Sequence, residues 1–359
     1  DVLGSRGLGD VYKRQVLQNE NGVPVMEVPM AYRMKRGAYD LFRGQFSLAE
    51  RGLYFYYFRI AARTGEFRLF KDGDNTNMEA GDLWQLSCIP SDFETPEWAQ
   101  GAIFYQIFPD RFRKAGKCDL SGKLEPYTIH QSWDEDVDWR PTAEGLVLNN
   151  DFFGGNFRGI AEKLDYIASL GATVLYLNPI GKSFSNHRYD TGDYKTPDPM
   201  LGTEADFSAL CAAAHARGMR IILDGVYSHT GSDSLYFDKN RTFGGHGAYC
   251  DPNSPYRNWY TFHRYPDSYA CWWDFETLPT VNKLDPSFVE YVITGEDSVL
   301  AHWIRLGADG FRLDVVDELP NEFVALLKKR LRELKPDALL IGEVWEDASN
   351  KSAYGIRRR

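Results

Sequence analysis

The chain has few cysteines, and they show no pairing pattern. Five cysteines occur in 359 residues, an odd number, and no two of them have the C-x-x-C spacing. Disulfide scaffolds need an even, regularly spaced set in an oxidising compartment. The cysteine content therefore favours a reduced, cytoplasmic protein over a disulfide-stapled one.

Long apolar runs and an excess of positive charge are also absent. No apolar run approaches the roughly 18 residues that a membrane helix needs, and no secretory signal is visible. The net charge of −10 argues against nucleic acid and anionic membranes as partners, because both require a basic surface. The sequence also lacks a G-x-S-x-G elbow, a P-loop and an H-E-x-x-H motif, so the chemistries that depend on them are not expected.

The pattern of apolar residues changes at about residue 95. Residues 16–95 contain aromatic-rich runs, such as 53–60 and 66–71, which predict a β-sandwich. Residues 1–15 have no periodicity, and we expect them to stand apart from this domain as an artefact of sequence assembly. From residue 96 to 359 strands and helices alternate, which is typical of a parallel sheet in an α/β fold.

The second part contains five predicted strands, at residues 103–108, 173–177, 220–226, 310–316 and 339–344. Predicted helices lie at residues 159–170, 204–217, 286–306 and 321–334. The segment 231–284 is too long for an ordinary connection, so it is predicted to be an insertion after the third strand. Polar residues follow several strands, a pattern typical of a (β/α)8 TIM barrel, here truncated after about the fifth strand.

The fourth predicted strand carries two charged residues. Because strand side chains alternate, Arg312 and Asp314 share one face and Leu313 lies on the other. One interpretation is an internal ion pair, since buried charges are commonly paired. The other is a carboxylate that a fixed guanidinium keeps ionised, ready to act as a nucleophile. Residues 224–229 and 342–345, each at the end of its own strand, favour the second interpretation.

Residues 224–229, 310–314 and 342–343 resemble, in order and spacing, three signature regions of the α-amylase superfamily, glycoside hydrolase family 13. Residues 187–194 are similar to a loop of its neopullulanases, cyclomaltodextrinases and maltogenic amylases, and residues 278–282 lie where that subgroup has a short motif. The resemblance implies a retaining hydrolase of α-1,4-glucosidic bonds. Its partner would be an α-glucan oligosaccharide or polysaccharide, such as maltodextrin, cyclodextrin or pullulan, and the parent protein could be a homodimer.

Two carboxyl groups would carry the chemistry. A retaining glycosidase needs them roughly 5–5.5 Å apart, and adjacent strands, which lie about 4.7–4.9 Å apart, can supply this separation from Asp314 and Glu343. Asp314 would attack the anomeric carbon, with Arg312 holding it ionised. Glu343 would protonate the leaving oxygen, with its pKa raised by Asp314; the alternative for Glu343 is a helix-capping acid.

By the resemblance, His229 and Asp224 bind hydroxyls of the sugar at the cleaved bond. Alternation alone would place these two residues on opposite faces, so both can face inward only if the strand ends near Tyr227. Ser228 stands where the family usually has Asn, a departure that could alter hydrogen bonding in the loop.

Aromatic residues would line the sugar site. The resemblance makes Tyr189 the stacking platform, with His187 and Asp190 nearby. A core tyrosine is the alternative, which fits Tyr194 better than Tyr189. Trp345 resembles an acceptor-side stacker, and a packed indole is the alternative.

No cofactor is expected, and calcium is only weakly supported. Relatives often hold calcium with an Asn/Asp-rich stretch after the first strand, but residues 113–117 are mostly basic here, which disfavours a dication. The remaining candidate oxygen ligands are Asn149, Asn150, Asp151 and Asn156, for which solvated turns are the alternative.

Two other functions stay open. A 4-α-glucanotransferase would use the same machinery with a sugar as acceptor. A non-catalytic glycan-binding relative is disfavoured by the presence of Asp314, Glu343 and Arg312. The family's third catalytic-site carboxylate would lie beyond Arg359, so we expect the chain as given to be inactive and, because its sheet would have open edges, poorly folded.

Overall fold

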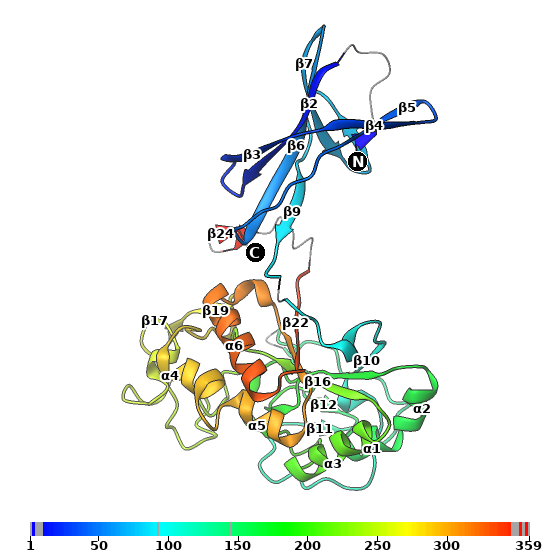
Figure 1. Ribbon diagram of the computed structural model, residues 1–359. Coiled ribbons are helices and arrows are strands. Elements are labelled where there is room, and N and C mark those ends of the chain that lie inside the picture. Colours follow the sequence, from blue (N-terminus) through cyan, green and yellow to red (C-terminus); the bar gives the residue numbers. More distant parts are fainter. Residues whose placement is uncertain are drawn as a thin grey trace. The chain divides into compact units, whose positions relative to one another are not determined.

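The computed structural model describes residues 2–3, 10–91, 93–143, 145–345, 352–353 and 356–357. It separates into two compact units (Figure 1). One ends at Glu94 and resumes after Trp345, and the other is Thr95–Trp345. Among the described residues, none of the helices is both long enough and apolar enough to cross a membrane.

The first unit is β-rich, as the sequence predicts. Its strands are β1 (Val2–Leu3), β2 (Asp10–Asn19), β3 (Pro24–Pro29), β4 (Ala31–Arg36), β5 (Tyr39–Arg43), β6 (Gly52–Ala62), β7 (Gly65–Asp72), β8 (Asn75–Asn77), β9 (Trp84–Cys88), β23 (Ser352–Ala353) and β24 (Ile356–Arg357). The long β6 is the centre of a six-stranded antiparallel sheet, in which it pairs with β2, β7 and β9. The strands β1, β5 and β4 form a separate sheet.

Residues 10–15, which the sequence predicts to be an artefact of assembly, are paired with β6 in the structure. These residues form the first half of β2, where Arg14 pairs with Arg59 and Gln15 with Phe58. The ladder uses backbone groups, so a polar segment without clear alternation can still be paired. The side chain of Lys13 joins β2 to the other sheet of this unit, because its Nζ lies 3.6 Å from the centre of the Phe42 ring in β5. Residues 4–9 lie outside the described residues.

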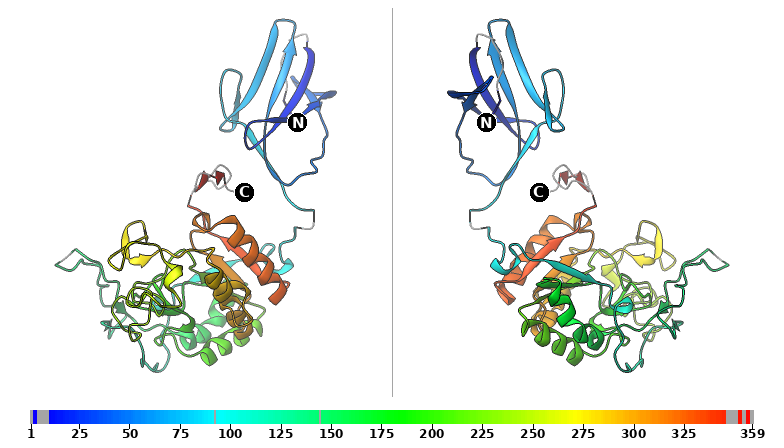
Figure 2. Two further views of the ribbon diagram at one scale, coloured as in Figure 1. Left: turned by 90° about the vertical axis from the view of Figure 1, so that its left-hand side faces the viewer. Right: turned by 90° about the vertical axis from the view of Figure 1, so that its right-hand side faces the viewer.

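The second unit contains a five-stranded parallel sheet in chain order (Figure 2). Its strands are β10 (Phe104–Ile107), β13 (Val174–Leu177), β16 (Arg220–Gly225), β21 (Gly310–Leu313) and β22 (Leu339–Gly342). The helices are α1 (Phe157–Glu162), α2 (Leu164–Ser169), α3 (Glu204–His215), α4 (Pro286–Val289), α5 (Val299–Leu306) and α6 (Asn321–Leu334). Sequential parallel neighbours with helices between them are the arrangement of a (β/α)8 barrel. All five predicted strands exist; β13 ends at Leu177 as predicted, and the other four end one to three residues earlier than the sequence suggests.

Smaller elements occupy the connections. They are the strands β11 (Thr128–Ile129), β12 (Asp151–Phe152), β14 (Gly181–Ser183), β15 (Thr191–Pro197), β17 (Phe262–Arg264), β18 (Ser268–Tyr269), β19 (Cys271–Trp272) and β20 (Phe275–Pro279), and the 3-10 helices Glu97–Ala99, Pro109–Arg111, Arg257–Trp259 and Val316–Glu318. The segment 231–284 holds two of the hairpins, β17–β18 and β19–β20.

Two predicted helices are wrong as continuous elements. The segment 286–306 is interrupted by a π-helix at Glu290–Thr294, and it restarts at α5 because the Ser298 side chain accepts the N–H of Ala301. Such an N-cap bond satisfies a free helix donor and so begins a new helix. The segment 159–170 is likewise split at Lys163 into α1 and α2.

The two faces of the parallel sheet have different chemistry. Apolar residues at alternate positions are buried against the helices, among them Leu175, Leu177, Ile221, Leu223, Phe311 and Leu313. The opposite face carries a small apolar layer of Val174, Ile222 and Leu339. Beyond this layer, toward the carboxyl ends of the strands, it becomes polar with Tyr176, Asp224 and Arg312.

A buried carboxylate ties the other end of the sheet together. Asp309, directly before β21, is fully buried and accepts hydrogen bonds from His215 Nε2 (2.7 Å), Arg220 Nη1 (3.1 Å) and the N–H of Ile221 (2.8 Å). Lys335 Nζ lies 3.1 Å from the same carboxylate. Burial raises the pKa of Asp309, but the bonds from His215 and Ile221 outweigh it and bring the pKa below its usual value. This carboxylate therefore joins α3, β16, β21 and α6.

We expect Asp309→Asn to lower the free energy of unfolding by about 3–5 kcal/mol, because it removes one partner of a buried ionic network. Urea denaturation of the full-length protein measures this loss. Asp337→Asn is the matched control, since Asp337 is 3.8 Å from Arg220 but about half exposed, and it should cost less than about 1 kcal/mol. Equal losses in the two variants would contradict the role given to Asp309.

Candidate active site

One guanidinium joins three carboxylates at the carboxyl ends of three adjacent strands. Arg312 Nη1 donates to Asp224 Oδ1 at 2.7 Å and to Asp314 Oδ1 at 2.9 Å. Arg312 Nη2 lies 2.6 Å from Glu343 Oε1. The strands β21 and β22 pair directly, which confirms that Asp314 and Glu343 follow adjacent strands. Residues distant in the sequence thus form a single charged cluster.

Asp314 itself lies beyond its strand. The prediction that this strand reaches residue 316 is wrong, because β21 ends at Leu313 and Val315 adopts a left-handed conformation with φ of 42°. A β-branched residue in this region stores strain of about 1–3 kcal/mol. The turn directs the N–H of Val315 to Glu343 Oε2, at 3.0 Å. The strained turn therefore orients the carboxylate of Glu343 and also carries the carboxylate of Asp314.

Tyr189 is tied to the same cluster. Its hydroxyl donates to Asp224 Oδ2 at 2.9 Å and accepts from Asn178 Nδ2 at 3.1 Å. A second hydroxyl, that of Tyr176, also donates to Asp224 Oδ2. The sequence analysis did not identify Tyr176 or Asn178. Their signal was present, since two polar residues two positions apart at the end of a strand share one face.

His229 faces inward because its strand ends early. The strand β16 stops two residues before Tyr227, so strict alternation no longer applies. His229 Nε2 lies 3.2 Å from the carbonyl oxygen of Tyr189, and Nδ1 lies 2.9 Å from Ser228 Oγ. Burial lowers the pKa of His229 to about 4, so the ring is neutral near pH 7. A carbonyl only accepts, so Nε2 carries the proton and Ser228 donates to Nδ1.

His187 and Asp190 are near the cluster without joining it. His187 Nδ1 accepts the N–H of Tyr189 at 3.1 Å, and burial lowers the pKa of this histidine. The Asp190 carboxylate accepts from the N–H groups of Phe184 and Ser185 and from the Ser185 hydroxyl. These bonds turn Asp190 toward its own loop, so it supports Tyr189 from behind.

Trp345 lies in a strip of aromatic rings that leads away from the carboxylates. Its side chain is 56% exposed, which disfavours the packed-indole interpretation. Its ring centre lies 5.7 Å from that of Trp273 and 6.5 Å from that of Trp272. Trp272 in turn lies 5.6 Å from the ring of His229. The sequence analysis did not identify Trp272 and Trp273, which lie in the segment 231–284.

The charge balance of the cluster opposes ionisation of Asp314. Burial, followed by the negative charge of Asp224, raises the pKa of Asp314 to about 7, although Arg312 lowers it and Glu343 raises it further. Arg312 favours the ionised form of Asp314, as the sequence predicts, but burial and the neighbouring carboxylates outweigh its effect on the pKa. Burial is the largest cause of the raised pKa, and the sharing of one positive charge among three carboxylates adds to it.

The calcium site that relatives suggest does not fit these residues. Asp151 Oδ2 already accepts from His130 Nε2 at 2.9 Å, and Asn156 Oδ1 accepts two backbone N–H groups, one as the N-cap of α1. The side chain of Lys114 lies over Gly154, where it would be 3.5 Å from an added Cβ. Across the described ranges, no group of three His, Cys, Asp or Glu side chains is arranged to hold a metal.

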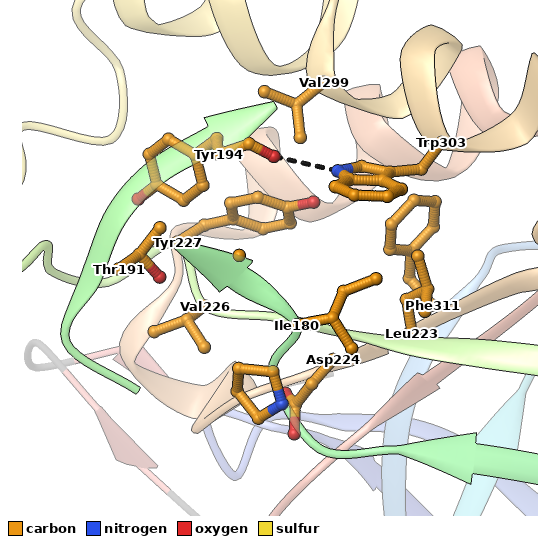
Figure 3. A pocket seen from close by; sticks show the side chains of 12 residues that line it. Ile180, Thr191, Tyr194, Leu223, Asp224, Val226, Tyr227, Val299, Trp303 and Phe311 are labelled. Carbon is orange, nitrogen blue, oxygen red and sulfur yellow. Dashed lines mark hydrogen bonds between the residues drawn. The ribbon is translucent and has the colours of Figure 1, made fainter. Parts of the chain in front are cut away.

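A small cavity lies behind Asp224 (Figure 3). Its volume is about 30 Å³ and most of its lining is apolar, with Leu223, Phe311 and Trp303 among the residues. Figure 3 shows the Trp303 indole donating to the carbonyl oxygen of Tyr194, at 2.8 Å. A water needs roughly 10–15 Å³, so the cavity could hold a water but not a sugar ring. It is a gap in the core that borders the carboxylate cluster at Asp224.

The parallel sheet and the carboxylates at its strand ends define a glycosidase-type site on a βα barrel. Comparison with protein families agrees, because the model of the alpha amylase catalytic domain matches residues 106–358. The chain belongs to the α-amylase family.

Individual relatives fall within this family. An amylopullulanase of Thermoanaerobacterium saccharolyticum is 38% identical over 74% of this chain, and neopullulanase 2 of Thermoactinomyces vulgaris is 32% identical over 95% of it. The solved type III pullulan hydrolase of Thermococcus kodakarensis superposes with a TM-score of 0.63, with 29% identity over 98% of this chain and 58% of that one. The chain spans 23% of the amylopullulanase and 56% of the neopullulanase.

The raised pKa of Asp314 predicts a stability effect with a definite sign. In the unfolded chain this group ionises near pH 3.9, so between about pH 4 and 7 the native state binds the proton more tightly. The free energy of unfolding should then fall as pH rises through this window. The pH effect is absent in Asp314→Asn. The free energy of unfolding of this variant minus that of wild type should therefore increase by about 2–4 kcal/mol from pH 4 to 8.

Urea denaturation at several pH values measures this difference. Asp274→Asn, at an exposed turn, controls for the amide replacement and should show no such trend. A pH-independent difference between Asp314→Asn and wild type would contradict the assignment.

Proposed function

We propose that the protein is a retaining α-glucan hydrolase that cleaves α-1,4-glucosidic bonds of maltodextrins, cyclodextrins or pullulan. The observation that supports this most is the pairing of Asp314 and Glu343 on one guanidinium, at the ends of directly paired strands. Retaining glycosidases use two carboxyl groups about 5–5.5 Å apart. The names of the relatives, which include amylopullulanase, neopullulanase and pullulan hydrolase, support the substrate class.

The reaction would proceed in two displacements. The ionised Asp314 attacks the anomeric carbon and forms a covalent glycosyl-enzyme, while Glu343 gives its proton to the departing glycosidic oxygen. In the second step Glu343 removes a proton from water, and the resulting nucleophile releases Asp314. Two inversions leave the product in the α configuration. Arg312, which contacts both carboxylates, would offset the charge on whichever one is ionised.

The neighbouring polar groups would hold the sugar at the cleaved bond. In this proposal Asp224 and the neutral His229 hydrogen-bond its hydroxyl groups, and the Tyr189 ring stacks on its apolar face. Trp345 and Trp273, which lie 5.7 Å apart and are both exposed, would stack on sugars of the acceptor side, since rings and sugar faces bury apolar area together.

The proposed domain division follows from the same assignment. In this proposal residues 16–95 form a β domain and residues 96–359 belong to the catalytic domain, with 231–284 as an insertion after the third strand. The structure differs at the C-terminal end, because it groups the residues after Trp345 with the β-rich unit. A (β/α)8 barrel has eight strands, and the described residues supply five of them. A cytoplasmic location and a homodimeric parent stay predictions.

We expect Asp314→Asn and Glu343→Gln each to lower maltodextrin hydrolysis by the full-length protein at least 10²-fold, since general acid–base catalysis alone contributes about 10²–10⁴-fold. The control is Glu276→Gln, an exposed acid in the segment 231–284, which should keep wild-type rates. Initial products are followed by NMR and should be α anomers. A tenth of the activity remaining in either variant, or β-anomeric products, would refute the roles assigned.

We expect chelation to leave the rate of maltodextrin hydrolysis unchanged within about twofold. The candidate ligands Asp151 and Asn156 are already bonded within the protein, and hard dications require free oxygen ligands. The measurement compares kcat/KM before and after dialysis against EDTA. A loss of activity that added calcium restores would overturn this prediction.

A further inference from the structure

A cluster of three charged side chains lies behind the Tyr189 loop. The side chains of Lys123, Asp198 and Arg188 are fully buried. Lys123 Nζ donates to Asp198 Oδ2 at 2.7 Å, and Arg188 Nε lies 3.4 Å from the same oxygen. Both cations lie over the Phe152 ring, at 4.4 Å and 5.6 Å from its centre.

Stability alone does not explain this cluster. Desolvating ions is costly, and replacing a buried ionic group by apolar side chains of similar volume is often neutral or stabilising. Arg188 is also poorly satisfied, because its Nε and Nη2 have no hydrogen-bond partner among the described residues. Its backbone adds strain, with φ of +64° in the left-handed region. Arg188 is better explained by the conformation that it gives to the Tyr189 loop.

The cluster holds the loop at several points. Arg188 Nη1 donates to the carbonyl oxygen of Asn186 at 2.9 Å, and its backbone N–H donates to Ser185 Oγ at 3.1 Å. Lys123 Nζ donates to the carbonyl oxygen of Ser183 at 2.6 Å. Lys123 belongs to the excursion after β10, and Asp198 directly follows β15. Two separate segments are thus fixed to the loop that carries Tyr189.

The loop contacts the carboxylate cluster through Tyr189. Tyr189 follows Arg188 directly, and its hydroxyl donates to Asp224 Oδ2 at 2.9 Å. Its carbonyl oxygen lies 3.2 Å from His229 Nε2. A shift of the loop would therefore disturb two groups of the candidate active site together.

We propose that Arg188, held by Asp198 and Lys123, is a positioning residue that sets Tyr189 against Asp224. Arg188 touches neither the carboxylates of the site nor a substrate, and it acts through the loop conformation. The effect on catalysis rests on the proposed hydrolase activity, whereas the effect on the position of Tyr189 does not.

The test is a double-mutant cycle with Arg188→Met and Tyr189→Phe in the full-length parent protein. Met removes the charge, leaves Lys123 paired with Asp198 and approximately keeps the volume. We expect Arg188→Met to lower kcat/KM for maltodextrin by about 10- to 100-fold, since a misplacement of about 1 Å can cost 10²-fold. If Arg188 acts through Tyr189, the double variant should be no worse than the poorer single variant.

Two further variants separate positioning from stability. Lys123→Met should give a smaller loss in the same direction, and it serves as the second test if Arg188→Met does not fold. Asp309→Asn, a buried carboxylate at the opposite end of the sheet, should lose stability yet keep the kcat/KM of wild type where it is folded. The proposal is overturned if the fold-losses in kcat/KM of the two single variants multiply in the double variant. It is also overturned if Arg188→Met keeps the kcat/KM of wild type.

A crystal structure of Arg188→Met gives a readout that needs no activity. The proposal expects the Tyr189 hydroxyl to be beyond hydrogen-bond distance of Asp224, and an unchanged Tyr189 would refute it. If the wild-type enzyme hydrolyses no α-glucan but Tyr189 still moves, the proposed function fails while the positioning role stands.

Discussion

The sharing of one guanidinium by three carboxylates is the constraint on which the site depends. Arg312 contacts Asp224, Asp314 and Glu343 from the middle strand of three. A single positive charge cannot offset three negative ones in a buried setting, so proton affinity within the cluster rises. The pKa of Asp314, at about 7, is the result. Groups that interact so closely titrate as a set, and pH profiles will report values for the cluster as a whole.

The rest of the second unit can be understood as support for this cluster. The apolar face of the sheet packs against the helices and keeps the polar face free for chemistry. Asp309 fastens the amino-terminal end of the sheet. In βα barrels that end serves stability, whereas the carboxyl end serves function. The ionic cluster of Lys123, Asp198 and Arg188 does related work at the carboxyl end, where it orients a loop.

Much of this arrangement could be predicted from the sequence, because it follows from local rules. The alternation of predicted strands and helices located the five parallel strands. Three carboxylates at strand ends then had to meet, since parallel strands share an edge. The contact between Asp224 and Arg312 was implicit in this pattern. Tyr176 and Asn178 were missed although their spacing at the end of a strand places them on one face.

The features that failed depend on tertiary structure. The left-handed turn at Val315 contradicts the preference of a β-branched residue, so only its surroundings can impose it. The helix-forming pattern of segment 286–306 predicts one continuous helix. In the structure a π-helix and the new N-cap at Ser298 interrupt it. The direction of the pKa shift at Asp314 depends on how many carboxylates meet one arginine. That number is a property of the fold and is not visible in any one motif.

The central claim is that Asp314 becomes covalently bonded to the sugar while Glu343 serves the acid and base steps. Its most direct test is mass spectrometry of the Glu343→Gln protein after incubation with an α-glucosyl fluoride. Fluoride leaves without a general acid, but release of the intermediate still needs the missing base. The account predicts an added hexose mass on the peptide that contains Asp314. A label on another residue, or rapid turnover with no labelled peptide, would contradict it.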